Sequence, residues 1–226
     1  MLRCKYHWLP LAALFCLLAT LPAQGADGAA ARNVPITGTD LFLRVPQSVI
    51  VSPYKSASPS VTTLSVEVEP IQSFHQNGII TRTDVLAQRT ALAKGHAKVA
   101  DTWEEVGLAD VITLPTGVNA VIYPFYSAFE ICDLRLTLNA AFFVGNCRVT
   151  IRYSLPPTAI IAENPIFFGH DQTNCGKASV WKHPGPDLFK RFHEAVKARK
   201  LGPAANTWYA DFTAILVSMH GKMPDK

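Results

Sequence analysis

Hydrophobic and polar residues alternate along several stretches of the chain, which is the pattern of strands with one buried face. The clearest stretch is VTTLSVEVEP, in which Leu64, Val66 and Val68 lie on one side and polar residues on the other. Two further stretches share the pattern: DLFLRVPQSVIV, predicted as a strand that ends near Pro46 and an extended piece at residues 49–51, and ADVITLPTGVNAVIYPFY, predicted as two strands around a Pro-Thr-Gly turn.

A helical pattern follows the strand VTTLSVEVEP, in the segment TRTDVLAQRTALAKG. Val85, Leu86 and Leu92 form its apolar stripe, and a glycine follows the lysine that closes the helix. Thr81 and Thr83 are both suitable caps, because a threonine hydroxyl accepts a hydrogen bond from a backbone N–H of the first turn. The sequence therefore predicts a helix that begins at one of these two threonines.

Two more amphipathic helices are predicted near the end of the chain. The segment PDLFKRFHEAVKARKLG has an apolar face and a basic face, and Gly202-Pro203 stops the helix. In the segment NTWYADFTAILVSMHG, Asn206 is the predicted cap and Gly221 the predicted end. The apolar stripe of this last helix consists of Trp208, Phe212, Ile215 and Met219.

The order of these elements is strands, helix, strands and helices. This order predicts an α+β fold, a largely antiparallel sheet packed with amphipathic helices in a single domain. We assign residues 38–226 to this domain and residues 26–37, which are small and polar, to a flexible lead-in. The turn-rich residues 156–185 give no firm secondary-structure prediction.

Residues 1–25 have the three parts of a secretory signal peptide. Arg3 and Lys5 give the positive start, residues 9–21 the apolar run, and Ala23-Gln24-Gly25 the small-residue cleavage site. The apolar run is too short to span a membrane comfortably, and no second run approaches that length. We therefore expect a periplasmic or secreted protein without stable membrane insertion after signal cleavage.

The segment ICDLRLTLNAAFFVGNCRVTIRYSL predicts a β-hairpin with two competing turns. A turn at Asn139-Ala140 would place Cys132 opposite Cys147. A turn at Gly145-Asn146 would place Val144 there instead. Two-residue hairpin turns need positive φ, which glycine and asparagine adopt readily and alanine resists, so we favour the second turn.

The favoured turn limits how the cysteines can pair. Three cysteines remain after signal cleavage: Cys132, Cys147 and Cys175. The first two would then lie on the order of 40 Å apart along a strand, whereas a disulfide needs Cα atoms within about 7 Å. In an oxidising compartment we therefore predict a disulfide between Cys175 and either Cys132 or Cys147.

Several of these runs, taken in order, resemble the PsbP-like α/β sandwich over roughly residues 38–200. The runs are LFLRVPQSVIV, the alternating strand and helix that follow it, LPTGVNAVIY, a hairpin that turns before CRVTIRYSLP, and FKRFHEAVKAR. The resemblance implies antiparallel strands with helices on both sides. It also implies a binding, assembly or chaperone-like role rather than one enzymatic chemistry.

The charge of the mature chain narrows the functional classes. Without the signal peptide, 19 Lys and Arg residues stand against 17 Asp and Glu residues, a net charge of about +2. This charge is too small for a nucleic-acid binder that works by phosphate neutralisation. A hydrophobic content of 49% with 17% charged residues indicates a globular protein rather than a disordered one.

The sequence has no Gly-x-Ser-x-Gly elbow, no Gly-rich phosphate loop and no His-Glu-x-x-His pair. In HEAVK, Lys197 stands where the second metal-binding histidine would be, so His193 is predicted as a helix boundary residue. The spacing of His170, Cys175 and His183 has little specificity for a metal. Cys175 as a nucleophile would need His170 or His193 as its base. We predict a disulfide tether at Cys175, and no catalytic residue, metal or cofactor.

Two sets of residues are candidates for binding a protein partner. Arg135, Arg148 and Arg152 share a face of the hairpin that is predicted to be wet, where they would dock an acidic partner or keep an open sheet soluble. The other set is an aromatic-rich loop, and aromatic side chains concentrate in interface hot spots but also fill cores. This loop carries Phe167, Phe168, His170 and Trp181.

Three functional hypotheses follow. The first is an exported, non-catalytic protein-binding module, in concrete form an inhibitor or immunity protein that neutralises an envelope-acting toxin. The second is an accessory factor of envelope assembly or secretion, which the PsbP-like resemblance would suit. The third is an enzyme that uses Cys175.

Overall fold

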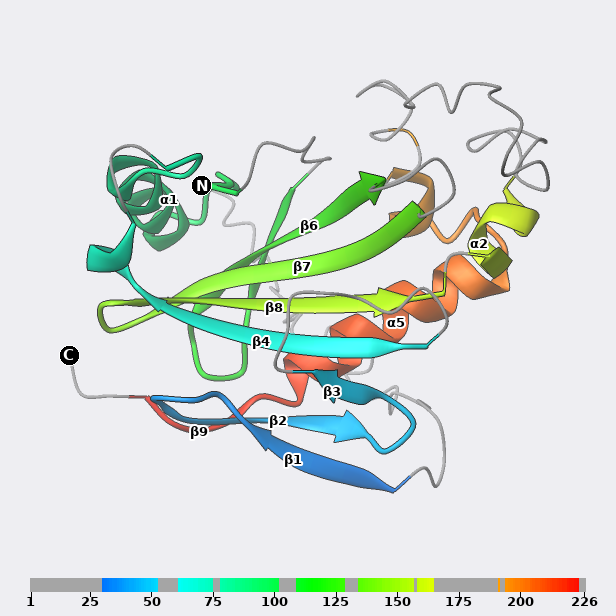
Figure 1. The fold of residues 1–226 in the computed structure, drawn as a ribbon, viewed down its shortest axis with the longest axis horizontal. Helices are drawn as coiled ribbons and strands as arrows, with labels where there is room; N and C mark the ends of the chain where they lie inside the picture. Colours follow the sequence, from blue (N-terminus) through cyan, green and yellow to red (C-terminus); the bar gives the residue numbers. More distant parts are fainter. Residues whose placement is uncertain are drawn as a thin grey trace, which may run out of the picture.

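The computed structural model describes residues 30–52, 61–74, 78–101, 109–128, 134–156, 158–164, 191 and 194–223. Its centre is a six-stranded sheet with the strand order β3-β4-β8-β7-β6-β5 (Figure 1). These strands are β3 (Ile50–Ser52), β4 (Thr63–Pro70), β5 (Asp110–Thr113), β6 (Asn119–Ala128), β7 (Leu134–Val144) and β8 (Cys147–Leu155). Neighbouring strands run antiparallel except β3 and β4, which are parallel, so the predicted antiparallel character is confirmed.

Three short strands form a second antiparallel sheet, below the large sheet in Figure 1, in the order β1-β2-β9. They are β1 (Ala31–Pro35), β2 (Asp40–Pro46) and β9 (His220–Lys222). The sequence predicts a flexible lead-in over residues 26–37, but residues 31–35 form β1 because Val34 is buried and pairs with Leu43. Val34 and Ile36 are both buried, but two positions give an alternation too short to predict this strand.

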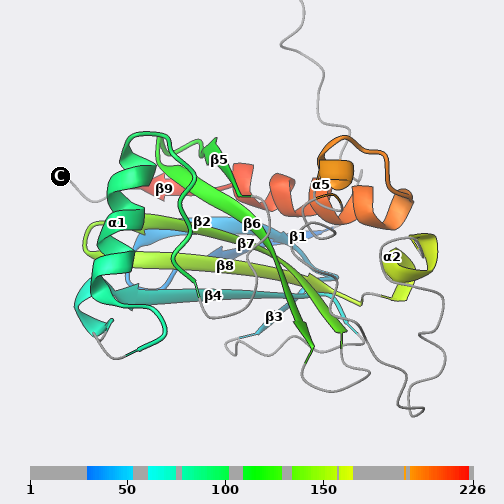
Figure 2. The ribbon, with the colours of Figure 1, turned by 90° about the horizontal axis from the view of Figure 1, so that it is seen from above.

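Helices cover both faces of the large sheet. The helix α1 (Arg82–Ala93) crosses the strands on one face, and α5 (Pro203–Val217) lies with the small sheet on the other (Figures 1 and 2). Two shorter helices are η1 (Ile71–Ser73) and α2 (Thr158–Glu163). Residues 191 and 194–197 are also helical, within the segment predicted as a helix from Pro186. The protein is therefore a single compact α+β domain.

The main hydrophobic core lies between the large sheet, the small sheet and α5. The side chains that point into it from three strands are Leu136 and Leu138 of β7, Leu41, Leu43 and Val45 of β2, and Val149, Ile151 and Tyr153 of β8. The predicted stripe of the last helix is confirmed, since Trp208, Phe212, Ile215 and Met219 are all buried there. The Phe212 ring stacks on Tyr153 with the ring centroids 5.8 Å apart.

The ends of α5 differ from the prediction. The helix begins at Pro203 with Gly202 as its N-cap, so Asn206 lies inside the helix rather than capping it. Proline is favoured at the first helical position because its φ is already helical and its missing N–H needs no partner there. The helix ends at Val217, and Gly221, the predicted end, lies in β9 instead.

The start of α1 is a capping box. The Asp84 N–H donates to the Thr81 hydroxyl at 3.2 Å, and the Thr81 N–H donates to the Asp84 carboxylate at 3.0 Å, so Thr81 is the cap. The predicted apolar stripe is partly wrong, because Leu86 is 40% exposed whereas Gln88 is fully buried. Positions three and four apart share a helix face, which places Gln88 in line with the buried Val85.

The hairpin of β7 and β8 turns at Gly145-Asn146, as predicted. Val144 lies opposite Cys147, and Gly145 has the positive φ of 56° that this turn requires. Cys147 carries a free, half-buried thiol. Cys132 and Cys175, the other two cysteines of the predicted pairings, lie outside the described residues.

Candidate functional site

The face of the large sheet beneath α1 is polar and largely buried, which corrects the prediction that it is wet. Arg148 is only 2% exposed, and its Nη2 donates to the backbone carbonyl of Ala100 at 2.6 Å. The helix α1 and the chain that follows it lie over this face (Figure 2). We call its interior groups the polar layer, which consists of Glu67, Gln88, Asp101, Tyr123, Asn139, Arg148, Thr150 and Arg152.

Arg152 is bound within the polar layer rather than offered to a partner. Its Nη1 lies 2.6 Å from the Glu67 carboxylate, and the two side chains are 16% and 19% exposed. Burial lowers the pKa of the Arg152 guanidinium, but the hydrogen bond and the charge of Glu67 outweigh it and raise that pKa overall. The guanidinium is therefore held in its charged form by an internal ion pair.

Tyr123 and Asp101 fasten the chain after α1 to the sheet. The Tyr123 hydroxyl donates to the Asp101 carboxylate. Burial is the main reason that the pKa of the Tyr123 phenol is raised, and the nearby Asp101 charge raises it further. The phenol therefore stays protonated as the donor, and together with Arg148 it binds two successive residues, Ala100 and Asp101.

Five buried atoms of the polar layer lack a hydrogen-bond partner among the described residues. They are both amide atoms of Gln88, both amide atoms of Asn139 and the Nε of Arg148. An unsatisfied buried polar group costs about 1–3 kcal/mol. Burial of the polar layer is therefore favourable only where such a hydrogen bond is made.

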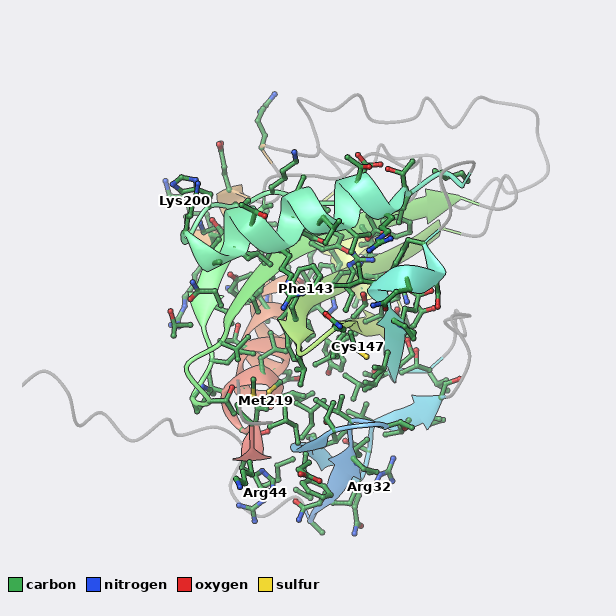
Figure 3. The ribbon with its side chains drawn as sticks, turned by 90° about the vertical axis from the view of Figure 1, so that its left-hand side faces the viewer. Arg32, Arg44, Phe143, Cys147, Lys200 and Met219 are labelled. Carbon is green, nitrogen blue, oxygen red and sulfur yellow. The ribbon has the colours of Figure 1, made fainter. Side chains whose placement is uncertain are left out.

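A hollow opens at the end of the sheet where the β5–β6 and β7–β8 turns meet α1. Its volume is about 710 Å³, and we call it the turn-end hollow. Leu92 and Phe143 form an apolar floor, and Figure 3 shows Phe143 beneath the helix. The rim carries Arg89, Asn119, Asn146 and Met223.

Hydrogen bonds between neighbouring elements fix the walls of the turn-end hollow. The Arg89 Nη1 donates to the Asn146 Oδ1 at 3.3 Å, which joins α1 to the β7–β8 turn. The Asn119 Nδ2 donates to the Leu92 carbonyl at 2.9 Å, and the Thr113 hydroxyl donates to the Asn119 Oδ1 at 3.0 Å. The hollow is thus formed before any partner arrives.

Of the candidate residues predicted from the sequence and described in the structure, Arg148 and Arg152 do not line this hollow. Arg148 and Arg152 both lie in the polar layer but bind different partners, and Arg135 lies in β7, where its side chain is not described. The aromatic loop and the other histidine candidates lie outside the described residues: Phe167, Phe168, His170, Trp181, His183 and His193. The sequence indicates the two turns but not that α1 crosses above them. It therefore does not predict that the rim residues come together.

Comparisons with known proteins add no relative. A search of protein-family models finds no match, and a search of curated proteins finds none. Within the described part of the chain, no three His, Cys, Asp or Glu residues gather as a metal-holding group. In the same part, no helix has both the length and the apolar character needed to cross a membrane.

Proposed function

We propose that the protein is an exported, non-catalytic protein-binding module that docks a partner protein at the turn-end hollow. In concrete form it is an inhibitor or immunity protein that neutralises an envelope-acting toxin. Export rests on the signal peptide predicted at residues 1–25. The observation that carries the binding role is a hollow whose lining combines the apolar Leu92 and Phe143 with the polar Arg89 and Asn146.

The shape of the turn-end hollow suits one anchoring side chain of a partner. Interface hot spots are often Trp, Tyr or Arg side chains that fill a pocket at the centre of a contact, surrounded by contacts that exclude water. Leu92 and Phe143 supply the apolar contact, and Arg89 and Asn146 supply the polar ring. Because these walls are already fixed, little conformational entropy is lost on binding.

The charge around the hollow indicates the character of the partner. The rim includes Arg89, and the exposed Lys94 directly follows the lining residue Ala93 at the end of α1. A surface with acidic groups around one projecting apolar side chain would complement this arrangement. Electrostatic complementarity of this kind raises the association rate more than the final affinity.

The experiment begins with tagged mature protein expressed in the periplasm of cells that carry their full set of secreted toxins. Co-purifying proteins are identified by mass spectrometry, and the affinity of a stoichiometric partner is measured with the wild type and with two variants. Ala93→Trp places a large ring beside the hollow from an exposed position of α1. Thr83→Trp adds the same ring at an exposed position in the first turn of α1, away from the hollow.

We expect A93W to weaken binding of a toxin-like partner by roughly tenfold or more, as truncated hot spots do, and T83W to leave it unchanged. Equal affinities of both variants would reject the hollow as the docking site. Recovery of a multi-component envelope assembly would replace the inhibitor role with that of an accessory factor. Turnover of a cell-wall or lipid substrate by the pure mature protein would overturn the non-catalytic role altogether.

A further inference from the structure

The outer face of the small sheet carries a second, polar hollow. In β2, Leu41, Leu43 and Val45 are buried against the core, so Phe42 and Arg44 between them point outward. The hollow has a volume of about 570 Å³ and is lined by Ala31, Asn33, Arg44, Ser218 and His220. Arg44 lies at the foot of Figure 3, on the small sheet and away from α1. We call this feature the Arg44 hollow.

One wall of the Arg44 hollow is held firmly. The His220 ring stacks on Phe42 with the centroids 5.8 Å apart, and its Nδ1 lies 3.0 Å from the Ser218 carbonyl. The Ser218 hydroxyl accepts a hydrogen bond from the Arg44 N–H at 2.9 Å and donates to the Ile215 carbonyl at 2.6 Å. The end of α5 is thereby tied to β2, and the wall keeps its shape.

Among the described residues of this face, the Arg44 guanidinium has no acidic residue directly opposite it. Across the β2–β9 pairing, Asp40 lies opposite Lys222, whereas Arg44 lies opposite Asn33 across β1. The hydrogen bonds of Arg44 to other described residues come from its backbone, which leaves the donors of its exposed guanidinium available. A planar guanidinium beside a neutral amide is suited to a carboxylate, which it binds through two parallel N–H bonds.

We propose that the Arg44 hollow binds a carboxylate, donated by an acidic side chain of the partner protein. Arg44 supplies two N–H donors, Asn33 supplies its amide, and the stacked His220 ring shields one side from water. The identity of the ligand as a protein side chain rests on the proposed function. His220 of this hollow lies three residues before Met223 of the turn-end hollow, which is about 10 Å of extended chain.

The test uses a defined probe rather than the unidentified partner. A fluorescein-labelled octapeptide of alternating Glu and Thr is titrated with the mature protein at low ionic strength, and binding is followed by fluorescence anisotropy. The control peptide has Gln in place of every Glu. We expect binding of the Glu peptide and none of the Gln peptide, because surface charge pairs need both charges.

Variants locate the binding on the protein. Arg44→Gln should weaken binding of the Glu peptide roughly three- to tenfold, the range of an exposed to half-buried ion pair. Arg82→Gln is the matched control, since it removes the same charge from an exposed position in the first turn of α1. Asn33→Ala should weaken binding less than R44Q, because it removes a neutral donor.

Three results would overturn the inference: no binding of the Glu peptide by the wild type, equal weakening by R44Q and R82Q, or stronger competition by inorganic phosphate than by acetate. The variants also separate this inference from the proposed function. If a co-purified partner is weakened by A93W and not by R44Q, docking at the turn-end hollow stands and the carboxylate site fails. If R44Q and not A93W weakens it, the carboxylate site stands and the turn-end hollow fails.

Discussion

The two faces of β7 show two different ways of burying a strand. Leu136, Leu138 and Phe142 point into the main core, where burial of apolar surface is itself favourable. Thr137 and Asn139 alternate with them on the opposite face and are also buried, and Asn139 lies opposite the charged Arg152 of β8. Burial on that side is favourable only where a hydrogen bond replaces water. The apolar face therefore stabilises the fold, and the polar face is held by specific bonds.

This difference explains why the two sides of the sheet are covered unequally. The core side is closed by α5 and the small sheet through large apolar side chains such as Trp208 and Phe212. The other side has a small apolar cluster around Leu92, to which hydrogen bonds of the polar layer are added. We therefore expect α1 and the chain after it to open before the core does.

The largest loss of stability is expected when a buried apolar residue on the core side is replaced by a polar one. Leu138 is fully buried, and Leu138→Asn removes its apolar contacts and leaves an amide without partners. The unfolding free energy of the variant protein should fall by about 3–5 kcal/mol, because a large core side chain is lost and a buried polar group is added. Urea unfolding measures this loss. Leu138→Met is the volume-matched control and should lose less than about 1.5 kcal/mol; an equal loss in both variants would show that shape rather than polarity decides.

A smaller loss is expected from breaking the ion pair on the polar side. Glu67→Gln leaves the Arg152 charge without its partner in a mostly buried position. We expect a loss of about 1–3 kcal/mol in unfolding free energy, below the value for fully buried pairs because both side chains keep some exposure. The double variant Glu67→Leu with Arg152→Met should be closer to the wild type than either single change. A double variant that loses the sum of both would contradict an internally balanced pair.

The sequence predicts much of this fold but not the burial of the polar side. Alternation predicts β4 and the β7–β8 hairpin, and the left-handed preference of glycine predicts the turn at Gly145. Arg148 and Arg152 alternate with apolar residues, which is also the pattern of a strand with one wet face. Their burial depends on where the chain goes after α1, a tertiary feature with no local periodicity. The turn-end hollow likewise depends on the tertiary position of α1 over the turns, which the sequence does not predict.

A gain rather than a loss is expected at the neighbour of Leu138. Asn139 is 1% exposed, and neither of its amide atoms has a partner among the described residues. Asn139→Leu keeps a similar side-chain size and should raise the unfolding free energy by about 1 kcal/mol, because it removes an unsatisfied buried group. Comparing the unfolding free energies of N139L and L138N contrasts the apolar and polar faces at neighbouring positions of one strand. A loss from N139L would show that the amide is bound in solution and that the polar layer is better satisfied than its bonds indicate.

The smallest effect concerns the start of α1 and depends on pH. Hydrogen bonds from Thr81 lower the pKa of the Asp84 carboxyl below its usual value. A carboxyl with a lowered folded-state pKa contributes its full stability above the unfolded-state pKa of about 3.9, and the contribution is lost as the pH falls through the folded-state value. Amide hydrogen exchange in the first turn of α1 should therefore be slower in the wild type than in Asp84→Asn near pH 6, and the two should converge in strong acid. Exchange rates that differ equally at both pH values would show that the charge of Asp84 does not hold the helix end.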